Sequence, residues 1–167
     1  MSQFSLRPLE EKDAERMLEW MRDPEITRFL QIGGPDTSRD KVLSFIKNAV
    51  EDRENLHMAI VTENDEYQGT VSLKHIDYSK KEAEYAITLH ASALGSGAAR
   101  EGTEQILKLA FQQMGLNRVY LFVQKNNTRA NRFYEKCGFK KTYMSSMIIR
   151  NRKRIVLWYE INKNSRM

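Results

Sequence analysis

The stretch ALGSGAARE, residues 93–101, holds two glycines one residue apart and is followed by a long helical pattern. Glycine loses more conformational freedom on folding than other residues, so such a pair indicates a required backbone geometry or a closely approaching ligand. The first turn of a helix carries unpaired N–H groups at the positive end of the helix dipole. A strand, a glycine turn and a helix start therefore predict an anion site, with a plain tight turn as the alternative.

Two familiar phosphate-binding loops do not match this stretch. The dinucleotide fingerprint requires glycine at its sixth position, where this chain has Arg100. The nucleotide-binding P-loop requires Gly-Lys followed by Ser or Thr, whereas Gly97 is followed by Ala98. The loop is therefore of neither type.

The chain on both sides of the loop alternates strand and helix patterns. Alternating apolar and polar residues predict strands, and apolar residues that recur at helical spacing predict helices. We expect strands over 4–9, 57–63, 67–77, 80–90, 117–124, 142–150 and 154–162. We expect helices from Asp13 to Pro24 and over 39–52, 98–115 and 127–139. The predicted fold class is α/β or α+β with a mixed sheet.

Composition narrows the class of protein. A length of 167 residues suits one domain, residues 1–167, and the single cysteine, Cys137, excludes an internal disulfide and fits a reducing compartment. No apolar run suits a signal peptide or membrane span, so we expect a cytoplasmic protein with no membrane partner. The net charge of +5 favours anionic ligands over polycations such as polyamines. The basic run at 150–154 lacks neighbouring aromatic residues, so we expect a solvated turn and no nucleic-acid partner.

A second motif lies in VQKNNTRANRFYEKCGF, residues 123–139. It has the pattern Asn-x-x-Ala-x-x-x-Tyr-x-x-x-Gly-Phe, from Asn127 to Phe139. Together with the loop from Ser92 to Gly97, it resembles the GNAT superfamily of acetyl-CoA-dependent N-acetyltransferases. The first residues of the chain are similar to members that modify ribosomal proteins, amino sugars or aminoglycosides. The resemblance implies the GNAT fold, a mixed and mostly antiparallel sheet that is splayed at the acetyl-CoA site and flanked by helices.

The resemblance also implies which residues bind acetyl-CoA as co-substrate. Backbone N–H groups between Thr88 and Ala91 would stabilise the developing oxyanion. The other implied coenzyme-binding residues are Leu89, His90, Gly95, Ser96, Gly97, Ala98, Ala99, Arg100, Asn127 and Lys136. Ser92 departs from the arginine or glutamine common in the family, which removes one phosphate contact, and Arg100 is a candidate to supply charge instead.

For catalysis, the resemblance assigns Tyr134 as the proton donor to the departing thiolate. An ordinary packing role is the alternative for this ring. For the general base we choose Glu84, with Glu82 and His75 as alternatives, because a carboxylate acting through water is the usual device. Neither His57 nor His90 has metal-ligand spacing with Cys137, so we expect no metal, and Cys137 itself reads as a packing residue.

The predicted function is direct transfer of an acetyl group to an amine, without a covalent enzyme intermediate. The acceptor would be a small-molecule amine, with a nucleotide-linked amino sugar among the candidates, or a protein or peptide N-terminus. The protein would be a monomer or homodimer. The alternative is a non-catalytic module of the same fold that senses acyl-CoA. Several apolar residues of the first helices either pack in the core or line the acceptor pocket, namely Met17, Trp20, Met21 and Phe29.

Overall fold

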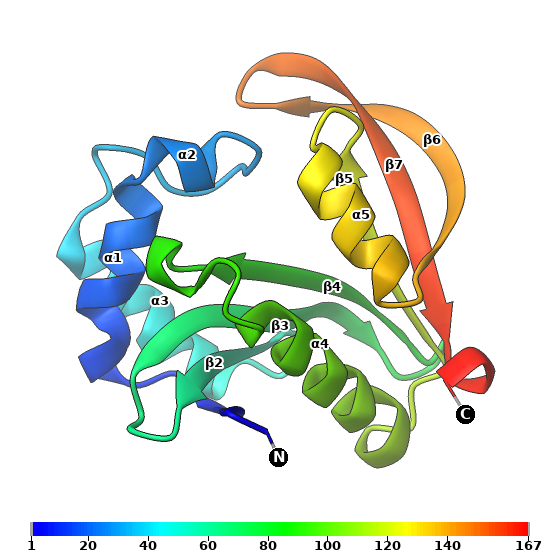
Figure 1. Cartoon of the computed structure of the whole chain (residues 1–167), viewed down its shortest axis with the longest axis horizontal. Coiled ribbons are helices and arrows are strands. Elements are labelled where there is room, and N and C mark those ends of the chain that lie inside the picture. The colour runs from blue at the N-terminus through cyan, green and yellow to red at the C-terminus, as the bar shows by residue number, and fades with distance from the viewer. Residues whose placement is uncertain (1, 167) are drawn as a thin grey trace.

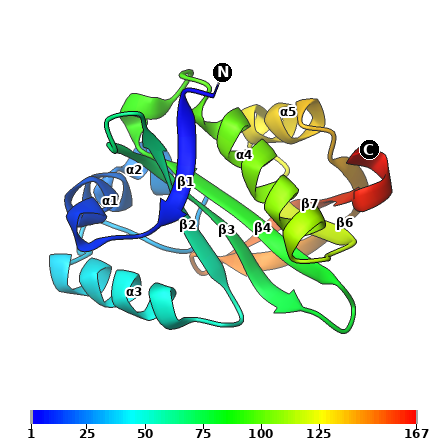
Figure 2. The ribbon, with the colours of Figure 1, turned by 90° about the horizontal axis from the view of Figure 1, so that it is seen from below.

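A seven-stranded sheet forms the centre of the molecule, and helices cover both of its faces (Figures 1 and 2). The computed structural model describes residues 2–166. In sheet order the strands are β1 (Phe4–Pro8), β2 (Leu56–Thr62), β3 (Tyr67–Asp77), β4 (Glu82–Leu89), β5 (Arg118–Gln124), β7 (Arg152–Asn162) and β6 (Lys140–Ile149). Neighbours pair antiparallel except β4 and β5, which run parallel. The mixed, mostly antiparallel sheet confirms the predicted fold class.

Two apolar cores lie on opposite faces of the sheet. On one face, α1 (Ala14–Arg22) and α3 (Arg39–Glu51) pack against β2 through Met17, Met21 and Ile46. On the other face, α4 (Ala98–Lys108) and α5 (Thr128–Lys136) cover the larger core, and Figure 2 shows α3 and α4 on opposite sides of β1–β4. The helix predicted over 98–115 instead ends its regular part at Lys108 and continues as a π-helical turn, Leu109–Gln113.

The sequence suggested that Pro24 ends the first helix. This is confirmed, since α1 ends at Arg22, but Pro24 also begins a further short helix that the sequence analysis did not expect, α2 (Pro24–Thr27). The Asp23 side chain accepts a hydrogen bond from the Glu25 N–H at 3.0 Å, which caps the new helix. Proline suits the first position of a helix, where its missing N–H would have had no partner in any case.

The sheet opens between β4 and β5. Their pairing joins only Glu82–Glu84 to Arg118–Tyr120, after which the strands diverge. Figure 1 shows β4 leading toward α1, while β5 diverges from β4 and rises beside α5. The strand ends that flank this gap carry the two motifs found in the sequence.

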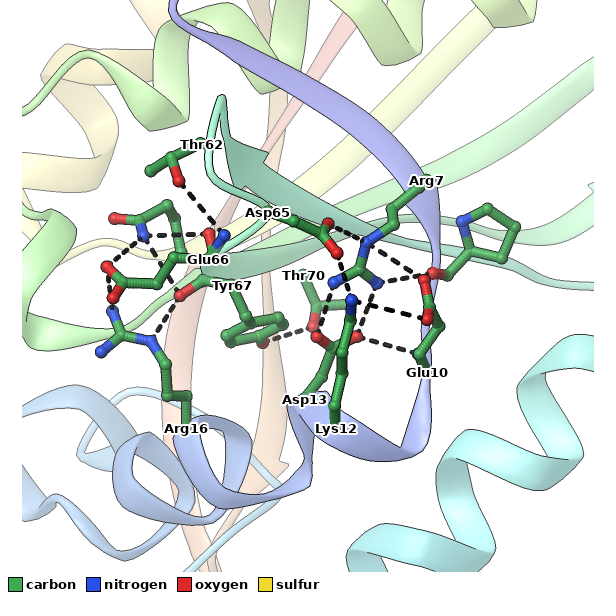
Figure 3. A network of polar contacts seen from close by, with 12 residues as sticks. Arg7, Glu10, Lys12, Asp13, Arg16, Thr62, Asp65, Glu66, Tyr67 and Thr70 are labelled. Carbon is green, nitrogen blue, oxygen red and sulfur yellow. Dashed lines mark hydrogen bonds and ion pairs between the residues drawn. The ribbon is translucent and has the colours of Figure 1, made fainter.

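A polar cluster fixes α1 to the first three strands (Figure 3). Arg7 on β1 holds the Asp13 carboxylate through two hydrogen bonds of 2.8 Å, and Asp13 is 2% exposed. Arg7 and Lys12 both bind Asp65 in the turn between β2 and β3. Both hydrogen bonds lower the pKa of the Asp65 carboxyl, and the one from Lys12 has the larger effect. The cluster therefore sets where α1 lies relative to the open edge of the sheet.

Candidate active site

The glycine loop carries a row of unpaired backbone donors. Gly95 and Gly97 have φ angles of +79° and +94°, which favour glycine, and no atom lies within 4 Å of a Cβ built on Gly95. The N–H groups of Leu94, Ser96 and Ala98 are bonded inside the loop. Four other N–H groups of this stretch have no acceptor among residues 2–166, namely those of Gly95, Gly97, Ala99 and Arg100. Four free donors at a helix start suit a phosphate group.

The end of β4 supplies a second set of free backbone groups. The His90 N–H donates to the Gln68 carbonyl at 2.8 Å, so the backbone groups of His90 point toward β3. Thr88, two residues earlier, lies opposite Thr70 of β3 and points the same way. Because an antiparallel ladder alternates, the backbone groups of Ile87 and Leu89 then point the other way, toward β5. Pairing with β5 has already ended at Glu84, so these groups face the gap. Within the range Thr88–Ala91 expected to supply the oxyanion contact, Leu89 faces the gap and Thr88 does not, while Ile87, just before that range, also faces it.

Tyr134 lies on α5 against the face of the sheet that bears this gap. Its ring packs edge-on against Tyr85 of β4, with centroids 5.8 Å apart, and against Phe139 at 5.9 Å. The hydroxyl makes no hydrogen bond with any described residue, and it is not among the fully buried oxygen atoms of residues 2–166 that lack a partner. Burial is the main cause that raises the pKa of Tyr134, and the nearby Cys137 raises it further. Tyr134 is thus a neutral donor without a partner.

The beginning of α5 is held by two asparagines. The side-chain oxygen Oδ1 of Asn127 caps the helix by accepting from the Ala130 N–H at 3.3 Å. Asn131 was not singled out in the sequence, yet it is buried and donates to the carbonyl of Asn127 at 2.8 Å, while its own oxygen accepts from Tyr159. Lys136 is exposed in the last turn of α5, about 13 Å along the helix from Asn127.

Glu84 lies on the opposite face of β4 from Tyr85. Its side chain is 11% exposed and pairs with Lys74 of β3, with Nζ and Oε2 3.3 Å apart. Glu84 lies opposite Tyr120 in the register of β4 on β5 and Glu82 lies two residues earlier, so the three side chains share a face. Burial, followed by the carboxylates of Glu84 and Glu82, raises the pKa of Tyr120. The alternative base His75 is exposed, at an irregular position of β3. Glu84 therefore lies where the gap between β4 and β5 begins.

Aromatic side chains continue this face across β5, β7 and β6. Trp158 contacts Phe122 with centroids 5.3 Å apart and stacks on Tyr143 at 5.5 Å with an interplanar angle of 9°. Tyr120 lies next in the row, 6.3 Å from Trp158. Arg118 joins Glu82 and Glu160 at the same edge. Nothing in the sequence indicated this row, because its members come from three strands.

The loop after α2 is fastened to the turn between β6 and β7. Arg150 donates to the carbonyl oxygens of Leu30 at 2.6 Å and Ile32 at 2.7 Å, and Gln31 donates back to the Ile148 carbonyl. Figure 1 shows the loop and the turn facing one another across the open side of the gap. The basic run at 150–154 thus serves partly as a structural clamp.

His90 is directed away from the gap. Its Nε2 lies 2.7 Å from the Glu19 carboxylate on α1, and its Nδ1 lies 2.8 Å from Ser92 Oγ. Its N–H and carbonyl are also bonded within the protein, to Gln68 and Ala93. A polar contact between His90 and a ligand, as the resemblance implied, would have to displace one of these bonds.

Among residues 2–166, no three His, Cys, Asp or Glu side chains gather as metal ligands would. Over the same range no helix is long and apolar enough to cross a membrane. Cys137 is buried in the larger core.

Comparison with known proteins agrees with this geometry. A family model described as an acetyltransferase (GNAT) domain matches residues 3–140. The chain belongs to the GNAT acetyltransferase family. The family confirms the resemblance drawn from the loop and the Tyr134 motif, and it makes this chain an N-acetyltransferase with acetyl-CoA as co-substrate. It also favours the enzyme over the non-catalytic module.

Three relatives illustrate the likeness of this GNAT enzyme. An N-acetyltransferase of Bacillus licheniformis, p20, is 29% identical over 142 residues, which cover 83% of this chain and 79% of the relative. A spermidine N-acetyltransferase of Vibrio cholerae is 27% identical over 138 residues, with the same two coverages. The crystal structure of a Vibrio cholerae spermidine N-acetyltransferase with CoA and spermine has a TM-score of 0.88 at 24% identity, covering 99% of this chain and 98% of that one.

The residues present fit acetyl-CoA. The free N–H groups of the glycine loop match a pyrophosphate, and the unpaired edge of β4 can hydrogen-bond the amides of an extended pantetheine arm. Both features lie at the same opening of the sheet as Tyr134.

Proposed function

We propose that this enzyme acetylates a primary amine of a small, positively charged aliphatic molecule, with polyamines as the acceptor class. The observation that carries the proposal is the row of aromatic rings beside Glu82, Glu84 and Glu160 on the acceptor face. Ring faces and carboxylates are the groups that recognise alkylammonium ions. The relatives from Vibrio cholerae and Escherichia coli that are named spermidine N-acetyltransferases support the same class.

The net charge of +5 favoured an anionic acceptor, but the local surface is the better guide. Charges are screened over about 8–10 Å at ordinary ionic strength, so residues beside the acceptor dominate its binding. On this face the three glutamates form ion pairs with only two cations, since Lys74 pairs with Glu84 and Arg118 bridges Glu82 and Glu160. The excess of negative charge favours a cation.

The two faces of β4 divide the chemistry. On the coenzyme side, Gly95, Gly97, Ala99 and Arg100 donate N–H groups to the pyrophosphate, and Ser96 and Ala98 hold the loop in shape through their internal bonds. The Ile87 and Leu89 backbone groups bind the pantetheine arm and polarise the carbonyl. Asn127 and Lys136 add contacts from α5.

Proton transfer uses one residue on each side of the gap. Tyr134 donates to the departing sulfur, which its unpaired hydroxyl and raised pKa allow at neutral pH. Glu84 accepts the proton of the amine directly or through a water molecule. Because the thioester lies in the gap between them, the amine attacks it directly and the enzyme needs no nucleophile of its own.

An acceptor panel tests the proposal. Free-thiol release is measured with spermidine, a nucleotide-linked amino sugar and a peptide with a free N-terminus, and we expect the highest kcat/KM with spermidine. Glu84→Gln should lower kcat with the best amine at least about tenfold, since general-base catalysis contributes about 10²–10⁴-fold. Glu25→Gln, at an exposed carboxylate in α2, is the control and should leave kcat unchanged. Preference for the sugar or the peptide would contradict the acceptor class, and full activity of Glu84→Gln would remove its role as base.

A further inference from the structure

The glycine loop lacks a cation of its own at the position that the family commonly fills. Ser92 occupies that position, and its short hydroxyl side chain carries no positive charge to bind a phosphate. Arg100 is exposed and forms no ion pair with any described residue. The free N–H groups of the loop carry only partial charges, whereas a pyrophosphate carries full ones. The loop by itself therefore leaves part of the ligand charge without a partner.

Arg16 of α1 supplies a guanidinium at this place. Its Nη2 donates to Ser92 Oγ at 2.8 Å, although 76 residues separate the two in the chain. Its Nε donates to the Tyr67 carbonyl at 2.6 Å, as Figure 3 shows. The Glu66 carboxylate lies farther off, at 3.8 Å, and is itself 60% exposed. The guanidinium is thus held beside the first residue of the loop by two strong hydrogen bonds.

Part of the Arg16 side chain remains available to a ligand. A guanidinium has five N–H groups, and the bonds to Tyr67 and Ser92 use one from Nε and one from Nη2. No described residue accepts a hydrogen bond from Nη1. The side chain is 25% exposed, so these donors can reach solvent. Arginine in such a fixed fork is well suited to bind phosphate oxygens through two parallel bonds.

The neighbouring contact keeps Arg16 in place. Glu19, three residues later on the same side of α1, binds His90 at the end of β4. The start of α1 is fixed independently by the buried pair of Arg7 and Asp13. Helix α1 is therefore attached at both ends of the segment that carries Arg16, and the guanidinium needs no large rearrangement to bind.

We propose that Arg16 binds the pyrophosphate of acetyl-CoA and replaces, from a distant helix, the basic side chain that is missing at Ser92. The inference rests on the use of the glycine loop for acetyl-CoA. It assigns a coenzyme-binding residue outside both motifs and makes α1, which also covers the acceptor face, part of the coenzyme site.

Calorimetry of ligand binding tests the assignment without catalysis. Wild type, Arg16→Gln and the control Arg22→Gln, which alters another arginine of α1, are titrated with CoA, with dephospho-CoA and with pantetheine. We expect Arg16→Gln to lower the affinity for CoA and dephospho-CoA about tenfold, as for loss of a hydrogen bond between charged groups. Its affinity for pantetheine and its melting temperature without ligand should match those of Arg22→Gln.

Other outcomes overturn the assignment in distinguishable ways. Unchanged CoA affinity of Arg16→Gln, or an equal loss for pantetheine, would show that Arg16 only supports the structure. A loss seen with CoA but not with dephospho-CoA would move the contact away from the pyrophosphate. If wild type bound no CoA, the coenzyme site itself would fail.

Two further variants guard against a folding defect. Adding Ser92→Arg to Arg16→Gln places a guanidinium on the exposed loop and should restore most of the CoA affinity. If Arg16→Gln does not fold, Arg16→Lys decides, because it keeps the charge but not the fork and should lose CoA affinity about threefold with pantetheine unchanged. Equal binding of both ligands by Arg16→Lys and wild type would overturn the inference.

Discussion

The coenzyme side and the acceptor side of β4 are built in different ways. On the proposed coenzyme side the groups available to a ligand are mostly backbone N–H groups of a contiguous stretch around Gly95 and Gly97. On the proposed acceptor side the available groups are side chains from β4, β5, β7 and β6, which the sheet brings together. Backbone donors suit a ligand that every member of a family shares, whereas side chains are free to vary with the acceptor. Arg16 is the exception, a side chain from a distant helix on the coenzyme side.

The largest effect should come from Tyr134, where the two sides meet. Tyr134→Phe keeps the ring contacts with Tyr85 and Phe139 but removes the free hydroxyl. We expect kcat to fall at least about tenfold, within the range of about 10²–10⁴ for general acids, while calorimetric CoA affinity stays nearly constant. Because burial raises the pKa of Tyr134, the donor persists to higher pH than for an exposed tyrosine, so wild-type kcat should show no falling limb from this group below the usual tyrosine range.

The exposed Tyr78→Phe is the control for this variant and should keep full kcat. If Tyr134→Phe turned over at the wild-type rate, the residue would serve packing alone. A collapse of CoA affinity with kcat retained would make it a coenzyme contact instead.

The second effect concerns the backbone side. Gly97→Val places a branched side chain beside free donors at a positive φ angle, so we expect CoA affinity to fall about tenfold or more, with strain of about 1–3 kcal/mol in the free protein. Gly115→Val is a matched control, since Gly115 also has a positive φ angle with open space around it, at the end of the helix rather than in the loop. Thermal unfolding should show similar losses for both variants. Equal CoA binding by the two would mean that Gly97 serves only the turn.

The smallest effect should lie on the acceptor side, where several rings share the contact. Trp158→Leu removes the centre of the aromatic row, and we expect KM for the amine to rise about fivefold, as for loss of a cation–π contact of about 1 kcal/mol. CoA affinity should not change. Ile155→Ala, at an exposed residue of the same strand, is the control. A change in CoA affinity with an unaltered KM for the amine would show that Trp158 acts on coenzyme binding and not on the acceptor.

The positions of most elements followed from the sequence, because hydrophobic periodicity reports which face of a segment is buried. The short helix at Pro24 and the π-helical turn at Leu109 did not, since capping by Asp23 and packing on the sheet decide them. For the site, the glycine loop and the segment from Asn127 to Phe139 were visible because each is contiguous and its spacing reflects local backbone geometry.

The tertiary structure alone decided which groups face the open gap. The register of β3 on β4 turns Ile87 and Leu89, rather than Thr88 and His90, toward β5, and a shift of one residue would reverse the choice. The tertiary structure also brings Trp158 against Tyr143 and Arg16 against Ser92. Such contacts depend on how helices and strands far apart in the chain pack together, and no local pattern of residues encodes them. The sequence by itself determined the coenzyme loop, its helix and the tyrosine motif, because local backbone geometry requires those residues; packing between distant segments decided the rest.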